Sequence, residues 1–127
     1  MIKLNFEKMD GLIPAIAQDY LTGEVLMVGF MNEDAWRHTL TSGEATYFSR
    51  TRQTLWTKGK TSGNLQIVKE IRIDCDDDTV LLKVEQVGGA SCHLGYRSCF
   101  FKKVDTDNSA LQIIGKPVFD PKDVYNL

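Results

Sequence analysis

The feature that most constrains the fold is a pair of alternating apolar segments on either side of an acidic run. Successive side chains of a β-strand point to opposite faces, so apolar residues at every second position predict a strand with one buried face. The segments 65–73 and 79–87 show this pattern and are expected to be two strands joined through Asp74–Asp78. The residues expected on the buried faces are Leu65, Ile67, Ile71 and Ile73 in the first segment and Val80, Leu82 and Val84 in the second.

The first third of the chain predicts a hairpin followed by a helix. A strand is expected at 12–17, where Pro14 favours an edge position or an irregularity. It is expected to pair with the run 25–31, which is apolar enough to be a central strand. Asn32 has the side chain of an N-cap, and Gly43 is a typical residue for ending the helix that follows.

Three shorter strands complete the expected fold, at 45–49, at 54–57 and, as a last core strand, at 99–104. No repeat or linker divides the chain. The predicted fold class is therefore α+β and predominantly β. We expect a single compact domain over 1–127, with a curved antiparallel sheet and one main helix at about 32–42.

Composition excludes several classes of function. Hydrophobic residues at 43% and charged residues at 25% are typical of a soluble globular protein. A net charge of −2 gives no footprint for a nucleic acid. No apolar run approaches the roughly 20 residues that span a bilayer, and the first residues lack a secretory signal. A cytoplasmic protein with no membrane or nucleic-acid partner is expected.

The three cysteines, Cys75, Cys92 and Cys99, are candidate zinc ligands. Three cysteines in a reducing compartment are either ligands, catalytic groups or small buried hydrophobes. Two of them have other ligand-type residues beside them, which favours metal binding. Three protein ligands with one open position are typical of catalytic zinc. His93 could be a fourth ligand, a structural residue or, as we favour, the group that moves a proton near a zinc-bound water.

The acidic run predicts a second, harder cation site. On a strand, Asp74, Asp76 and Asp78 would share one face, and Cys75 and Asp77 would share the other. Three carboxylates on one face repel one another unless a cation such as Mg²⁺ or Ca²⁺ neutralises them. A solvated acidic turn between two strands is an equally good interpretation.

Basic side chains and hydroxyls gather between residues 49 and 63. Arginine, lysine and loop N–H groups suit phosphate oxygens, although no P-loop motif is present. Such a loop is also typical of a solvated surface, and its tryptophan could either stack on a base or pack inward. The candidate substrate-binding residues are Ser49, Arg50, Arg52, Trp56, Lys58 and Ser62.

Together these motifs resemble the phosphoribosyl-AMP cyclohydrolase family of histidine biosynthesis. The resemblance covers about residues 12 to 101 and implies hydrolysis of the N1–C6 bond in the adenine ring of phosphoribosyl-AMP. The product would be the formimino-carboxamide ribonucleotide. The matching motifs are 25–27 with 31–32, Tyr47–Arg52, Leu55–Gly59, Thr61–Gly63, Asp74–Asp78, Cys92–His93 and Ser98–Phe100.

The resemblance also implies roles for the candidate residues. A zinc-bound hydroxide would attack the ring, and His93 would move a proton. Mg²⁺ and the basic loop would hold the phosphates. An interlocked homodimer would share each zinc site, with Cys75 coming from the partner subunit. The implied ligands are Cys75, Cys92 and Cys99 for Zn²⁺ and Asp74, Asp76 and Asp78 for Mg²⁺.

The chain departs from the family pattern at three places. Lys60 stands where Glu is usual, Leu94 replaces a usual Thr, and the run 88–91 is one residue longer. No second, pyrophosphohydrolase domain is expected. The alternative function is a non-enzymatic nucleic-acid-binding β-module that uses the basic loop and Trp56. Such a module would have no need for three cysteines beside an aspartate run.

Overall fold

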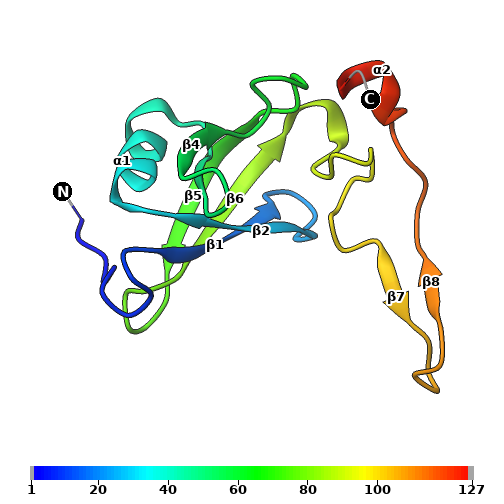
Figure 1. Ribbon diagram of the computed structural model, residues 1–127, viewed down its shortest axis with the longest axis horizontal. Helices are drawn as coiled ribbons and strands as arrows, with labels where there is room; N and C mark the ends of the chain where they lie inside the picture. Colours follow the sequence, from blue (N-terminus) through cyan, green and yellow to red (C-terminus); the bar gives the residue numbers. More distant parts are fainter. Residues whose placement is uncertain (1, 126–127) are drawn as a thin grey trace.

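The structure is a computed structural model that describes residues 2–125 and confirms the α+β, mainly β fold class (Figure 1). Met1, Asn126 and Leu127, the ends of the expected 1–127 domain, lie outside the described residues. The centre is a four-stranded sheet in the order β2-β1-β6-β5. Its strands are β1 (Ile13–Asp19), β2 (Val25–Met31), β5 (Gln66–Ile73) and β6 (Val80–Gln86).

The predicted β1–β2 hairpin is confirmed, but the expected positions of its two strands in the sheet are wrong. The two strands pair antiparallel, yet β1 is an inner strand and β2 lies at the edge. β1 also pairs parallel with β6, so the sheet is mixed rather than purely antiparallel. An inner β1 tolerates Pro14 because the ladder to β6 begins only at Ala15.

A β-bulge in β5 changes which residues face the core. The register with β6 shifts between Val68 and Glu70, so the faces of β5 exchange at this point. Val68 packs against the core together with Ile71 and Ile73, whereas Ile67 does not belong to the core cluster. The predicted shared face of Leu65, Ile67, Ile71 and Ile73 is therefore wrong in its first half. The alternation predicted for β6 is confirmed, because Val80, Leu82 and Val84 are fully buried.

Helix α1 (Glu33–Ser42) begins and ends as its sequence predicts. The Asn32 side chain accepts a hydrogen bond from the backbone N–H of Ala35, at 2.8 Å. Gly43 takes a left-handed conformation with φ of 75° and ends the helix. The buried face of the helix carries Trp36, which is 2% exposed and belongs to the core.

A small hairpin and a short helix position the segments that form the candidate site. Strands β3 (Thr46–Ser49) and β4 (Thr54–Thr57) form a small antiparallel hairpin beside the main sheet. The short helix η1 (Val87–Gly89) follows β6. Gly88 and Gly89 both have positive φ, at 78° and 75°, a conformation that glycine adopts without strain. This bend turns the chain from β6 toward Cys92.

The C-terminal part forms an arm that projects from the sheet (Figure 1). It contains β7 (Lys102–Val104), β8 (Leu111–Ile113) and α2 (Pro121–Tyr125). The predicted core strand at 99–104 is wrong, because β7 begins only at Lys102 and all three of its residues are exposed. In the part of the chain that the structure describes, no helix is long and apolar enough to cross a membrane.

Candidate active site

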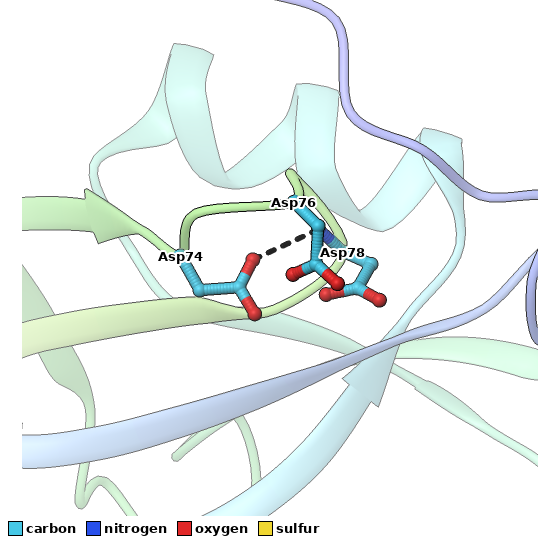
Figure 2. A group of neighbouring side chains, drawn as sticks. All are labelled: Asp74, Asp76 and Asp78. Carbon is cyan, nitrogen blue, oxygen red and sulfur yellow. Dashed lines mark hydrogen bonds between the residues drawn. The ribbon is translucent and has the colours of Figure 1, made fainter.

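The acidic run is a turn rather than a strand, so the predicted strand alternation at Asp74–Asp78 is wrong. Asp74 Oδ1 accepts the backbone N–H of Asp78, at 3.0 Å, and that of Thr79, at 3.2 Å. Asp77 is left-handed with φ of 61°, which aspartate tolerates better than most residues. The turn still brings together one carboxylate oxygen each from Asp74, Asp76 and Asp78, all within 4.8 Å (Figure 2). This group of candidate ligands includes neither Cys75 nor Asp77.

A lysine from the N-terminal segment neutralises part of this acidic turn. Lys8 Nζ lies 2.8 Å from a carboxylate oxygen of Asp76 and 3.1 Å from one of Asp78. Hydrogen bonds and the charges of both aspartates raise the pKa of Lys8, so its amine stays protonated. Three carboxylates with oxygen ligands at this spacing fit a hard cation such as Mg²⁺.

Residues 91–99, hereafter the cysteine loop, carry two of the three cysteines without any helix or strand. Backbone bonds hold the loop closed: the N–H of Ser91 donates to the carbonyl of Arg97, and the N–H of Cys92 donates to the carbonyl of Tyr96, both at 3.0 Å. The backbone N–H of Leu94 donates to Cys92 Sγ at 3.4 Å, an arrangement that suits a thiolate.

The charge of Cys92 affects the ionisation of Cys99. Burial raises the pKa of Cys99, and the charge of Cys92 raises it further, while the Lys58 ammonium opposes this shift. Two neighbouring thiolates repel each other and are stabilised by a soft cation, so this pair fits Zn²⁺.

Cys75 lies far from the other two cysteines within one chain. It is exposed in the turn before β6, whereas Cys92 follows β6 at the opposite end (Figure 1). A strand of 7 residues separates them by roughly 20 Å. Among the described residues, the three thiols do not form a group with metal-binding spacing.

A cavity of about 570 Å³ brings most of the other predicted residues together between the β3–β4 hairpin and the cysteine loop. Lys60, one of the three departures from the family pattern, also lines it. Arg50 does not line the cavity, since its guanidinium lies 4.0 Å from the centre of the Phe30 ring. The predicted residues that line the cavity are Ser49, Arg52, Trp56, Lys58, Ser62, His93 and Cys99.

The structure decides the position of Trp56, which the sequence left open, and places Lys58, a predicted substrate-binding residue, beside the cysteines. Trp56 is 38% exposed in the cavity wall, and its ring centre lies 5.0 Å from that of Tyr47. Lys58 is buried, and its ammonium donates a hydrogen bond to the carbonyl of Ser91. Burial lowers the pKa of Lys58, and the charges of Cys99 and Cys92 oppose this effect. The Lys58 ammonium therefore belongs to the cysteine end of the cavity.

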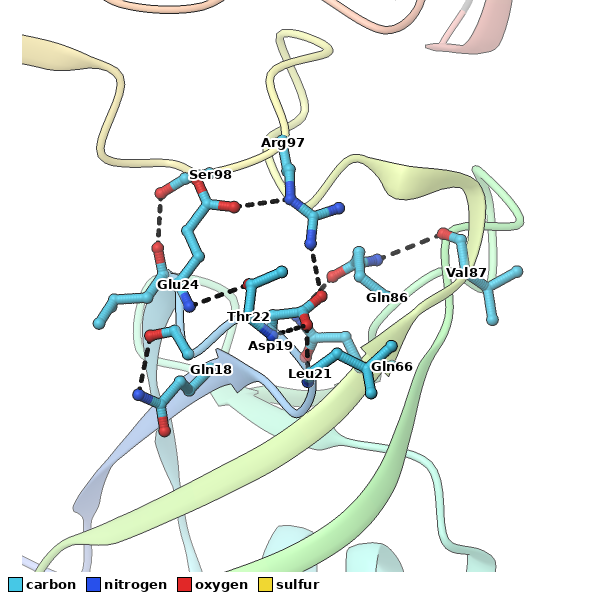
Figure 3. A network of polar contacts seen from close by, with 12 residues as sticks. Gln18, Asp19, Leu21, Thr22, Glu24, Gln66, Gln86, Val87, Arg97 and Ser98 are labelled. Carbon is cyan, nitrogen blue, oxygen red and sulfur yellow. Dashed lines mark hydrogen bonds and ion pairs between the residues drawn. The ribbon is translucent and has the colours of Figure 1, made fainter.

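Sequence reasoning missed Ser91 and an ion-pair network around Arg97. The Ser91 hydroxyl is buried without a hydrogen-bond partner among the described residues, and the residue lines the cavity. The position of Ser91 directly before Cys92 in the sequence could have indicated that it belongs to the site. Arg97 contacts Asp19 and Glu24 from the β1–β2 turn (Figure 3). No local pattern links residues so distant in sequence.

Comparisons with known proteins identify the family to which the chain belongs. The family model described as phosphoribosyl-AMP cyclohydrolase matches residues 27–101. Proteins named phosphoribosyl-AMP cyclohydrolase from Desulfatibacillum aliphaticivorans and Desulforapulum autotrophicum are each 66% identical over 125 residues, covering 98% of this chain and 98% and 99% of their own lengths. One from Desulfotalea psychrophila is 53% identical over 126 residues, with 98% of both chains covered. The chain therefore belongs to the phosphoribosyl-AMP cyclohydrolase family.

Proposed function

We propose that this chain opens the adenine ring of phosphoribosyl-AMP by hydrolysis of its N1–C6 bond, in histidine biosynthesis. As a member of the family it is a hydrolase of a cyclic amidine C–N bond. The observation that carries the proposed reaction is the cavity that has His93 and Cys99 at one end and basic and hydroxyl side chains along its wall. The cytoplasmic location expected from the sequence stays a prediction.

Zinc is the proposed catalytic metal, held by Cys92 and Cys99 of one chain and by Cys75 of the partner subunit. When bound by three protein ligands, zinc lowers the pKa of a water ligand to about 7 and so supplies hydroxide at neutral pH. Burial is the main cause of the raised pKa of Cys99, and the charge of the nearby Cys92 thiol adds to it, which supports this ligand set.

His93 is the proposed proton carrier. Its side chain is exposed at the cavity, next in sequence to Cys92, where an imidazole can take a proton from the attacking water. Trp56 offers a ring face for the purine in the same cavity. Arg52 and Ser62 are proposed to bind phosphate oxygens, and Arg50 would have to leave the Phe30 ring to join them.

A shared zinc site requires a homodimer, and the C-terminal arm supports one. Three apolar residues of the arm are strongly exposed in the single chain: Val104 at 56%, Leu111 at 62% and Ile113 at 55%. Exposed apolar residues clustered on one projecting hairpin are typical of an interaction surface. A second copy of the chain is the proposed occupant, since it would also supply the missing Cys75 thiolate.

Metal removal tests the proposal directly. We expect turnover of purified phosphoribosyl-AMP to be lost after exhaustive chelation and to return when stoichiometric Zn²⁺ is added with Mg²⁺. Mg²⁺ alone is the control and should not restore turnover, because carboxylates and thiolates prefer different cations. Full activity in protein that metal analysis shows to be free of zinc would exclude the proposed mechanism.

The acidic turn is proposed to bind Mg²⁺ that contacts the substrate phosphates, and Lys8 competes for the same carboxylates. We expect Lys8→Met to tighten Mg²⁺ binding about two- to fivefold, because exposed ion pairs such as the two that Lys8 forms are worth little in free energy. Calorimetric titration of the zinc-loaded protein measures this change. Lys69→Met, which removes a lysine 3.8 Å from Glu85, is the matched control and should leave the affinity unaltered. Unchanged or weaker Mg²⁺ binding in Lys8→Met would contradict the prediction.

A further inference from the structure

The cysteine loop needs an external support, because its own structure consists of turns. Its ends are joined by the two backbone bonds from Ser91 to Arg97 and from Cys92 to Tyr96, each 3.0 Å long. No helix or strand runs through these nine residues, so the geometry of the loop depends on the contacts that it makes with the rest of the fold. Metal affinity, in contrast, depends on how well the ligands are held before the metal arrives.

The support comes from the β1–β2 turn, through the side chain of Arg97 (Figure 3). Arg97 Nη2 lies 2.5 Å from Asp19 Oδ2, and Arg97 Nε lies 2.6 Å from Glu24 Oε1. One guanidinium therefore engages two carboxylates with two different nitrogens. Such forked contacts fix direction as well as distance.

Asp19 is a rigid anchor for this contact. It ends β1, is only 7% exposed, and its Oδ1 accepts the backbone N–H groups of Leu21 and Thr22, both at 2.9 Å. Burial raises the pKa of Asp19, but these hydrogen bonds and Arg97 outweigh burial and hold the pKa below its usual value. The carboxylate is thus charged at neutral pH and held on the sheet.

Arg97 connects this anchor to both cysteines. Its carbonyl accepts the N–H of Ser91, the residue before Cys92. The next residue, Ser98, donates its hydroxyl to the carbonyl of Val25 at 2.7 Å, and the N–H of Cys99 donates to the carbonyl of Leu26 at 2.7 Å. The Cys99 segment is therefore attached to the start of β2, and the Cys92 segment is attached to the backbone of the ion-paired Arg97.

We propose that Arg97, held by Asp19 and Glu24, is a positioning residue that sets the spacing of the Cys92 and Cys99 thiolates for the metal. Arg97 does not line the cavity, and it acts through the loop backbone. This inference rests on the proposed zinc site. Removal of an outer-shell partner of a metal site typically costs 10- to 100-fold in metal affinity.

The test measures Zn²⁺ affinity of the full-length protein by competition with a chromophoric chelator. We expect Arg97→Met to weaken binding about tenfold or more and Arg97→Lys to recover part of the loss. In the Co²⁺-loaded protein, the thiolate-to-cobalt absorption of Arg97→Met should shift or weaken, which loss of stability elsewhere would not cause. Arg37→Met is the matched control, since it breaks another 2.5 Å arginine–carboxylate pair, with Glu33 on α1.

Asp19→Asn, alone and with Arg97→Met, completes the experiment. If both residues act through one contact, the double variant should bind Zn²⁺ no more weakly than the weaker single variant. If Arg97→Met does not fold without metal, Arg97→Gln takes its place and must also weaken binding. Affinity and cobalt spectrum equal to those of the unmodified protein overturn the inference alone. Absence of tight zinc binding in the unmodified protein overturns the proposed function and this inference together.

Discussion

Cys92→Ala is expected to lower turnover of phosphoribosyl-AMP more than about a hundredfold, because loss of an outer-shell partner already costs 10- to 100-fold and Cys92 is a proposed ligand itself. The thiol is buried in the cysteine loop next to the proposed proton carrier His93. Zinc content should fall in parallel with turnover. Steady-state kinetics and metal analysis of the same preparations measure the two effects.

The control for this loss is Leu94→Thr, which changes an exposed residue of the same loop and leaves both cysteines in place. It should keep both zinc and activity. A Cys92→Ala protein that retains full turnover would show that the reaction proceeds without this thiolate, and the zinc mechanism would then be abandoned.

Mixing two inactive variants is expected to restore activity if the zinc site is shared. Cys75→Ser and Cys92→Ser are each expected to be inactive as pure proteins. After dissociation and random reassociation in equal amounts, half of the dimers are mixed, and each mixed dimer has one intact site, so turnover should reach roughly a quarter of the unmodified value. The measurement is specific activity after refolding together, compared with each variant refolded alone.

A second mixture provides the control for this complementation. Cys92 and Cys99 lie in the same cysteine loop, so a mixed dimer of Cys92→Ser and Cys99→Ser contains no intact site. No activity should return in that mixture. The shared site would be refuted if activity returned in the mixture of Cys92→Ser and Cys99→Ser. It would also be refuted if no activity returned in the mixture of Cys75→Ser and Cys92→Ser.

Local signals in the sequence predicted the elements whose stability is local. Asn32 and Gly43 bound α1 because capping depends on a few adjacent residues. The alternation of β6 predicted its buried face for the same reason. The bulge of β5 was not predictable, since it depends on the register with β6, and one inserted residue exchanges the faces of everything before it.

Interactions between distant segments could not be predicted from one sequence. The parallel pairing of β1 with β6 joins Ala15 to Val80, and the support of the cysteine loop joins Arg97 to Asp19. Neither leaves a periodic pattern. At the candidate site, the chemistry of the residues indicated which side chains matter. Which of them lie next to one another became known only from the structure. Lys58, for example, was expected in a phosphate loop and lies beside two thiols.

The placement of Cys75 and Cys92 at opposite ends of β6 has a consequence for the dimer that each ion would cross-link. If the proposed shared site forms, affinity for zinc and affinity for the second subunit would be linked quantities, because each event would strengthen the other by the same factor. Dilution should then release metal, and a chelator should release monomers. The concentration of the protein itself would set how much zinc it keeps.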